Sequence, residues 1–213
     1  RFKSKRLLNS FDYNGQFYWD IISLGFTKNS LHNYLLGQYV DNELFDWYAN
    51  KTGISRPKSL NDFRSIDKQI SLEGDMLVKV DRTSMLNSLE CRAPFLNKKI
   101  WDYSNSLPEN FLMKGWNKKY ILKEAFKDQF PNGFLEKSKN GFGVPVGDWL
   151  RSSLRTELEN YAIEKNLVSQ NIFQVNQIRE LIQNHLSGKS DNTFQVWTFY
   201  CFQKWYYNTY QLL

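Results

Sequence analysis

The segment from Leu72 to Leu96 constrains the fold most, because it combines the spacing of a helix with charge on its apolar side. If the chain is helical from about residue 73 to residue 89, Leu77, Asp81 and Met85 lie along one line of that helix. Asp81 then interrupts an apolar stripe. An ionised carboxylate removed from water is costly unless it is paired or hydrogen-bonded. We therefore expect Asp81 to have a partner, for example Arg82 or Arg92, either in an ion-pair strut or in a site.

The rest of the chain also favours helices, and strand-like alternation is scarce. The final segment, TFQVWTFYCFQKWYYNTYQLL, is apolar or aromatic nearly all round, which predicts a helix buried in the core or docked on another surface. Its predicted line comprises Phe194, Trp197, Cys201 and Trp205. We predict a mostly α, single helical domain over residues 1–213 with few or no strands. The other expected helices cover about residues 30–39, 42–49, 148–161 and 171–188.

Charge and composition exclude several classes of protein. The net charge of +6 favours polyanionic partners, but the basic residues are scattered and fit solvated faces better than a nucleic-acid footprint. The sequence has no apolar run long enough for a membrane span or a signal peptide, so we expect a cytoplasmic protein. Cys91 and Cys201 are too few for a disulfide scaffold, and we expect both to be reduced and structural. The chain begins with Arg1, so we expect it to be a piece of a longer protein.

Familiar catalytic and metal motifs are missing from this sequence. His32 and His185 are far apart and lack the neighbours of a metal motif, so each is interpreted as a surface or packing histidine. No Walker or dinucleotide-binding fingerprint is present. The segment from Lys137 to Pro145 remains, in which glycines flank an aromatic residue after two lysines. This loop suits phosphate recognition, with a surface turn carrying solvated lysines as the alternative.

The segment from Glu90 to Leu96 is a third candidate. Pro94 disfavours the α conformation for the residue before it, which predicts that the preceding helix ends there. Glu90 and Arg92 would then project beside Asp81 and Arg82. From the residues alone, these charges fit a structural salt-bridge network as well as a site.

Together, these segments resemble the C-terminal synthetase domain of the glutamine-dependent asparagine synthetases. Residues 77–97 match the family pattern L-V-K-V-D-R-x-S-M-x-x-S-L-E-x-R-x-P-F-L-D, with Asn97 in place of the last Asp. Residues 107–125 resemble a Leu-Pro followed by G-K-Y-x-L-(K/R)-x-A, and residues 139–150 resemble K-x-G-F-G-V-P-x-x-x-W-L. Order and spacing agree from Asp67 to Arg151, which makes the resemblance more specific than any one motif.

The resemblance implies an ATP-dependent amide synthesis on the helical C-terminal portion of a PP-loop ATP pyrophosphatase fold. The aspartate side chain would attack the α-phosphorus of ATP, pyrophosphate would leave, and ammonia from glutamine would displace AMP from β-aspartyl-AMP. The family's pyrophosphate loop and glutaminase domain are not in this sequence, so the fragment alone is expected to be inactive. ATP, a carboxylate substrate and Mg²⁺ are the expected ligands, with the Mg²⁺ ligands in the missing upstream segment. Membranes and nucleic acid are not expected partners, and a homodimer stays open.

The resemblance also assigns residues. Lys139 matches the family's active-site lysine, and Glu90 is the second catalytic candidate. Lys137 stands where the family commonly has Arg. The expected nucleotide-binding residues are Lys139, Gly141, Gly143, Asp81, Arg82 and Arg92, and no metal ligand is expected in this chain.

Two alternatives stay open. The first is a related amide-forming synthetase with another acceptor, such as a polysaccharide precursor, a β-lactam or a peptide, because Asn97 and the first sixty residues diverge. The second is a non-catalytic helical module in which the same segments serve only as structure and the basic charge engages an acidic partner or a nucleic acid.

Overall fold

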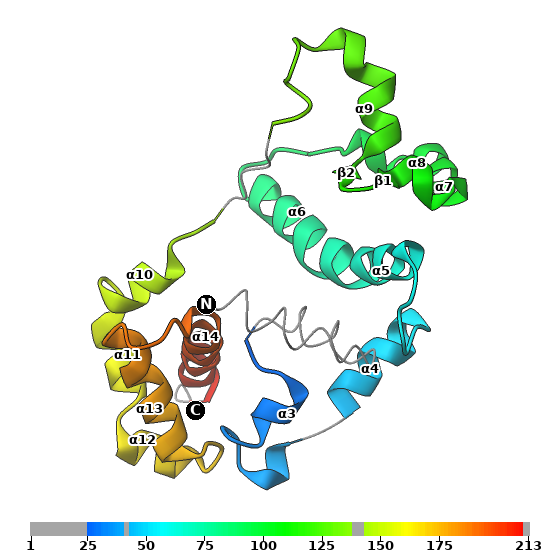
Figure 1. Cartoon of the computed structure of the whole chain (residues 1–213). Helices are drawn as coiled ribbons and strands as arrows, with labels where there is room; N and C mark the ends of the chain where they lie inside the picture. The colour runs from blue at the N-terminus through cyan, green and yellow to red at the C-terminus, as the bar shows by residue number, and fades with distance from the viewer. Residues whose placement is uncertain (1–24, 41–42, 138–142, 211–213) are drawn as a thin grey trace. The chain divides into compact units, whose positions relative to one another are not determined.

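The computed structural model describes residues 25–40, 43–137 and 143–210 (Figure 1). Contacts divide the chain into two compact units, unit 1 with residues 1–57 and 143–213, and unit 2 with residues 58–142. Within the described residues, helices dominate and the only sheet is one two-stranded hairpin. The prediction of a mostly α fold with few strands is therefore confirmed. The expectation of one helical domain over residues 1–213 stays a prediction.

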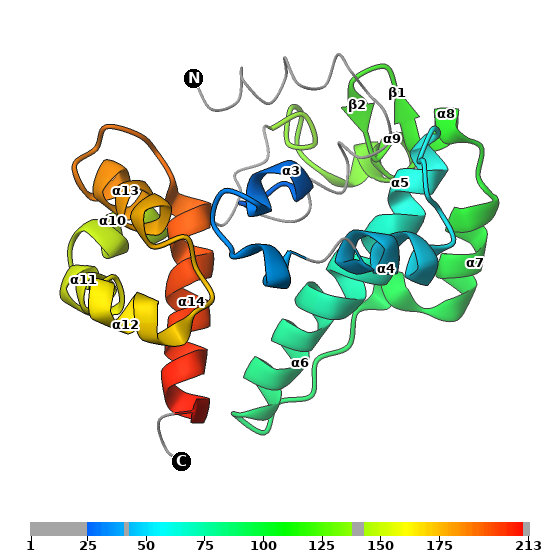
Figure 2. The same ribbon diagram turned by 90° about the horizontal axis from the view of Figure 1, so that it is seen from below.

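Unit 1 is organised around its last helix. Figures 1 and 2 show the shorter helices of residues 146–186 grouped along this long helix, and contacts join three of these helices to it directly. The helices are α10 (Val146–Arg151), α11 (Arg155–Tyr161), α12 (Glu164–Gln170), α13 (Val175–Leu186) and α14 (Thr193–Tyr210).

The core of unit 1 takes side chains from all five of these helices. Leu150, Leu158, Leu167, Ile178 and Val196 are each 1% exposed or less and belong to one cluster. Burying an aliphatic side chain of this size contributes roughly 1.5–3 kcal/mol relative to leaving it in water. The predicted periodicity of residues 148–161 is confirmed, although a break at residues 152–154 divides that segment into α10 and α11.

Helix α14 buries one face only. The buried residues are Val196, Phe199, Tyr200 and Gln203, which recur at helical spacing. Phe194 and Trp205, from the predicted line, are 45% and 51% exposed. Burial in the core therefore holds for one face only, the face that packs on α10, α11 and α13. Docking of the other face on another surface stays a prediction.

The N-terminal part of unit 1 contains short elements. They are α3 (Lys28–Leu31), the 3-10 helix η2 (Gly37–Tyr39) and α4 (Glu43–Thr52). Thr27, rather than Ser30, caps α3, and the two side chains form a reciprocal capping box. The expected helix over residues 30–39 is therefore wrong, since α3 ends after one turn. The expected helix over residues 42–49 is confirmed, and Gly53 ends it with a φ of +68°.

Backbone pairing ties this N-terminal part to the core of unit 1. The N–H of Leu36 donates to the carbonyl of Ile172 (2.9 Å), and the N–H of Gln174 donates to the carbonyl of Tyr34 (2.9 Å). These bonds fix the loop before α13 against the turn that follows α3.

Unit 2 begins with a long, continuous helical rod. It consists of α5 (Leu60–Asp67), the wide-turned π-helix η3 (Lys68–Leu77) and α6 (Val78–Met85). Ser59 and Asp62 form a capping box at its start. At its end, Ser88 has a φ of +56° and the N–H of Leu89 donates to the carbonyl of Ser84 (3.0 Å). The predicted helix is confirmed, but this left-handed cap ends it earlier than Pro94 would.

The remainder of unit 2 is a chain of short elements. A hairpin with Met113 opposite Lys118 joins the helix of residues 109–112 to the helix of residues 120–126. Lys119, with a φ of +58°, immediately precedes the second of these helices. The elements are the 3-10 helix η4 (Pro94–Leu96), α7 (Lys98–Ser106), α8 (Glu109–Leu112), β1 (Met113–Lys114), β2 (Asn117–Lys118), α9 (Tyr120–Phe126) and the 3-10 helix η5 (Lys127–Gln129).

Two further observations concern the described residues of both units. None of their helices has the length and apolar character that crossing a membrane requires. Cys91 and Cys201 are both free thiols, but both side chains are exposed, so the expectation that they serve as packed structural residues is wrong.

Candidate functional site

The first candidate pair, Asp81 and Arg82, lies on the exposed surface of α6. Leu77, Val78 and Met85, on and beside the predicted apolar stripe, are 39%, 36% and 54% exposed. Asp81 is also exposed, and its carbonyl accepts a hydrogen bond from the Ser84 hydroxyl (3.1 Å). The expectation of a buried carboxylate is therefore wrong for this structure. The helix spacing predicted an apolar face, but no described element of unit 2 covers that face.

Glu90 and Arg92 form an ion pair with each other, in the segment that follows α6. Their side chains are 67% and 86% exposed, so solvent screens the pair and its contribution to stability is small. No hydrogen bond or ion pair joins them to Asp81 or Arg82 in the part of the chain that the structure describes. The structure thus pairs two of the four predicted charges and leaves the other two separate from them.

The loop from Lys137 to Pro145, which we call the Lys139 loop, is described only at Lys137 and from residue 143 onward. Lys139 and Gly141 lie outside the described residues, whereas Gly143 is exposed and belongs to unit 1. The carbonyl of Pro145 accepts from the N–H groups of Asp148 (3.1 Å) and Trp149 (3.0 Å), which starts α10. Leu150, at the end of the third family-like segment, lies in the core of unit 1. That part of the motif is structural.

Unit 2 contains a groove lined by residues of the first two family-like segments and by Lys137, which precedes the third. We call it the lysine groove; its volume is about 580 Å³. Phe95 comes from the first segment, Lys118 to Lys123 from the second, and Lys137 leads into the third. Its lining residues are Phe95, Lys118, Lys119, Leu122, Lys123, Phe126, Phe130, Phe134, Leu135 and Lys137.

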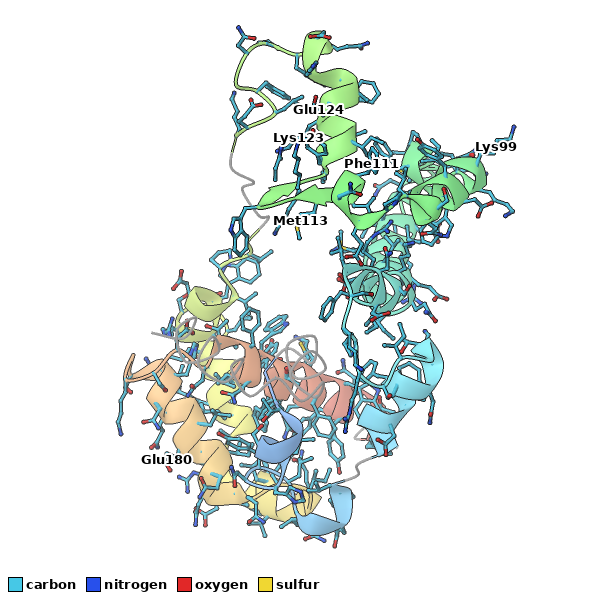
Figure 3. All side chains as sticks on the ribbon, turned by 45° about the vertical axis from the view of Figure 1, so that its right-hand side comes forward. Lys99, Phe111, Met113, Lys123, Glu124 and Glu180 are labelled. Atoms are coloured by element: carbon cyan, nitrogen blue, oxygen red, sulfur yellow. The ribbon has the colours of Figure 1, made fainter. Side chains whose placement is uncertain are left out.

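The floor of the lysine groove is aromatic and its charge is entirely positive. The rings of Phe130 and Phe134 stack with centroids 5.0 Å apart, and Lys137 Nζ lies 5.2 Å from the centroid of the Phe134 ring. Lys123 projects from α9 and donates to Asn117 Oδ1 at 2.7 Å (Figure 3). No carboxylate is among the lining residues. This groove can stack an apolar or aromatic group while lysine ammonium groups attract an anion.

The sequence interpretation missed this groove because it treated Lys118 and Lys119 as solvated charge. A signal was present: Phe126, Phe130 and Phe134 recur at four-residue intervals immediately after the second family-like segment. The spacing resembles one helical face, yet η5 ends at Gln129 and the chain then leaves the helix. The groove depends on this turn, which periodicity alone does not indicate.

His185 is one of two buried polar side chains among the described residues of unit 1, the other being Gln203. His185 is 0% exposed, and the Arg151 guanidinium contacts its Nδ1 (3.2 Å) and donates to its carbonyl (2.9 Å). Burial, and secondarily the charge of Arg151, lower the pKa of His185, which favours the neutral imidazole. His32 is exposed. The interpretation of these residues as packing and surface histidines is confirmed, and no cluster of potential metal ligands occurs among the described residues.

Comparison with known proteins places these features in a family. The Asparagine synthase family model matches residues 21–207. Glutamine-hydrolysing asparagine synthetase 1 of Bacillus subtilis is 30% identical over 155 residues, which cover 73% of this chain and 24% of that protein. A candidate glutamine-hydrolysing asparagine synthetase of Mycobacterium bovis is 32% identical over 141 residues, 66% of this chain and 22% of that protein.

A more divergent relative carries a different name. Amidase chyE of Penicillium rubens is 26% identical over 109 residues, 48% of this chain and 16% of that protein. No solved structure gives a significant match. The chain spans less than a quarter of the length of each of these relatives. Since the family model covers most of its residues, the chain belongs to the asparagine synthase family.

Proposed function

We propose that the protein carrying this chain is an ATP-dependent carbon–nitrogen ligase that converts aspartate to asparagine with ammonia from glutamine. The observation that carries the proposal is the lysine groove, where residues of the first two family-like segments and Lys137, which precedes the third, line an aromatic floor with a positively charged rim. Such a surface suits a phosphorylated ligand better than a neutral one. The family match supports the ligase class.

The proposed reaction has two steps. An oxygen of the aspartate side-chain carboxylate attacks the α-phosphorus of ATP, the bond to the bridging oxygen breaks, and pyrophosphate leaves with that electron pair. Ammonia then attacks the acyl carbon of β-aspartyl-AMP, loses a proton, and expels AMP to leave asparagine.

The residues of this chain would act mainly through charge. Lys139 would place its ammonium against the negative charge that develops on the phosphates, an effect often worth about 3–4 kcal/mol in the transition state. Gly141 and Gly143 would let the backbone approach the nucleotide. Glu90 is proposed as the second catalytic group, together with its partner Arg92, on the side of the site that binds the acceptor. Asp81 and Arg82 would shape the same side of the site.

The Mg²⁺ that usually accompanies ATP does not fit the described residues, since none of their acidic, histidine or cysteine side chains form a metal-binding cluster. No step is assigned to a metal here. A PP-loop ATP pyrophosphatase fold for the whole domain and a cytoplasmic location also belong to this proposal.

A related acceptor is the second candidate, because one relative is named an amidase. Aspartate labelled with ¹⁸O in its side-chain carboxylate distinguishes the candidates. The full gene product that contains these residues is incubated with ATP, Mg²⁺, glutamine and the labelled aspartate, and the products are analysed by mass spectrometry. We expect asparagine and AMP in equal amounts, with one ¹⁸O atom in AMP. Release of ADP, or AMP formation that does not depend on aspartate, would contradict the proposed reaction.

A further inference from the structure

A polar pocket in unit 2 lies between the start of the helical rod and α7. Its volume is about 370 Å³, and it shares no lining residue with the lysine groove. Its lining includes Arg64 from α5, Lys68 from the beginning of η3 and Trp101 from α7. Asn61 and Asn105 also line it.

The two cations of this pocket are held by neutral acceptors only. Arg64 Nη1 donates to Asn61 Oδ1 (2.8 Å), and Nη2 donates to the Ser104 carbonyl (3.3 Å). The Lys68 ammonium donates to Asn105 Oδ1 and lies 4.3 Å from the centroid of a Trp101 ring. In the part of the chain that the structure describes, no carboxylate lies within ion-pair distance of either cation.

One carboxylate is hydrogen-bonded to a residue of this pocket, but it does not pair with either cation. Glu109 Oε1 accepts the backbone N–H of Asn61 (3.2 Å) instead of pairing with either cation. The pocket therefore carries two positive charges without a counterion among the described residues.

This arrangement is electrostatically unfavourable as it stands. Arg64 and Lys68 are four residues apart on one helical face and both are half-buried, so their like charges repel. Burial, and then the charge of Arg64, lower the pKa of Lys68. An anion between the two side chains would reverse both effects, and both have hydrogen-bond donors left for it.

We propose that this pocket binds a phosphate group between the Arg64 guanidinium and the Lys68 ammonium. The planar fork of Arg matches the oxygens of a phosphate, Lys supplies a compact second charge, and a dianion balances the two cations. Trp101 provides an apolar wall for the body of a phosphate ester. The amides of Asn61 and Asn105 hold the cations in place.

The indole resonance of Trp101 reports on this site directly. The protein is labelled with 5-fluorotryptophan, the Trp101 signal is assigned with Trp101→Phe, and inorganic phosphate, phenyl phosphate and acetate are titrated separately. We expect saturable shifts with both phosphates, tighter binding of phenyl phosphate than of inorganic phosphate, and at least tenfold weaker binding of acetate. If phosphate does not shift the Trp101 signal, or if acetate binds as tightly as phosphate, the proposal is wrong.

Variants separate this pocket from other anion sites on the same protein. Lys68→Met and Arg64→Gln should each raise the phosphate Kd at least tenfold as seen by Trp101, with an unchanged far-UV circular dichroism spectrum. The matched control is Lys99→Met on α7, a lysine that does not line the pocket, and it should leave the Kd unchanged. If the phosphate response persists in the Lys68→Met/Arg64→Gln double variant, the assignment of these two residues is wrong.

Discussion

The two units differ in how they treat apolar side chains. Unit 1 buries a connected cluster contributed by five helices, whereas Ile66 is the one aliphatic side chain of unit 2 that is 0% exposed among the described residues. In unit 2, Leu86 is 84% exposed, Phe95 63% and Trp116 95%. The segments that match the family's first two motifs lie in unit 2. The structure thus places the packed core in unit 1 and two of the three family-like segments in unit 2.

This difference shows that the segments that resemble a family motif need not be the segments that form the packed core. The core of unit 1 is built from periodic helices, and only the end of the third family-like segment, Leu150, belongs to it. The motif-bearing unit 2 instead presents charged and aromatic side chains to the solvent. We expect substitutions in unit 1 to change the free energy of unfolding, and substitutions in unit 2 to change binding or turnover.

Truncation of a core side chain should have the largest effect on stability. Leu158→Ala removes a fully buried side chain and leaves a cavity among helices α10–α14. We expect a loss of about 2–5 kcal/mol in the free energy of unfolding of unit 1, measured by urea titration. The matched change in unit 2, Leu86→Ala, should stay within about 0.5 kcal/mol because that side chain is exposed. Equal losses would remove the contrast between the units.

Two glycines should respond with opposite signs. A Cβ on Gly147 in α10 would lie 2.4 Å from Thr193 Oγ1, whereas a Cβ on Gly74 in η3 would meet nothing within 4 Å. Gly147→Ala should therefore destabilise unit 1 by about 1–3 kcal/mol, since overpacking forces neighbours to move. Gly74→Ala should stabilise the helical rod by up to about 1 kcal/mol through helix propensity.

Thermal unfolding monitored by circular dichroism measures both changes. Combining Gly147→Ala with Thr193→Ala should recover part of the loss, because the clashing hydroxyl is removed. If the losses of stability in the two single variants simply add in the double variant, the close contact between the two positions does not cause the destabilisation.

The acid sensitivity of unit 1 should depend on Glu157. Its carboxylate accepts hydrogen bonds from the hydroxyls of Tyr200 and Tyr161 (2.7 Å for Tyr161) and from Lys204 Nζ (3.2 Å). These bonds, that of Tyr200 first, lower the pKa of Glu157. The stabilisation is therefore complete above the unfolded-state pKa of about 4.3 and is lost as the pH falls through the lower folded value.

Glu157→Gln tests this linkage by removing the titrating group. The variant should show a flatter dependence of stability on pH in the acid range, with a modest loss at neutral pH because the site is partly exposed. Glu159→Gln is the matched control on the same helix, since Glu159 forms only an exposed pair with Arg155. An unchanged acid transition in Glu157→Gln would show that other carboxyl groups control it.

The sequence predicted the helices well where one periodic face was dominant. The helix expected over residues 171–188 is α13, and the structure buries Ile178, Leu181 and Ile182 on one face of it. The sequence did not identify the packed face of α14, because aromatic residues occur on every side of that helix. The prediction failed for Asp81 because spacing identifies a helix face without identifying a neighbour that covers it.

The candidate site was predictable only in part for a similar reason. Motif spacing selected Glu90 and Arg92, which the structure pairs, and Lys139, whose role stays a prediction. The lysine groove depends on how the chain from Phe130 to Lys137 turns back beside α9. Long-range placement of this kind has no local sequence signal.

The most direct test of the account asks whether the Lys139 loop carries nucleotide chemistry. Aspartate-dependent exchange of labelled pyrophosphate into ATP is measured on the full gene product, on Lys139→Ala, and on Lys189→Ala, an exposed lysine of unit 1. We predict a loss of roughly a hundredfold or more in Lys139→Ala, with an unchanged circular dichroism spectrum, and normal exchange in Lys189→Ala. Near-normal exchange in Lys139→Ala would contradict this prediction.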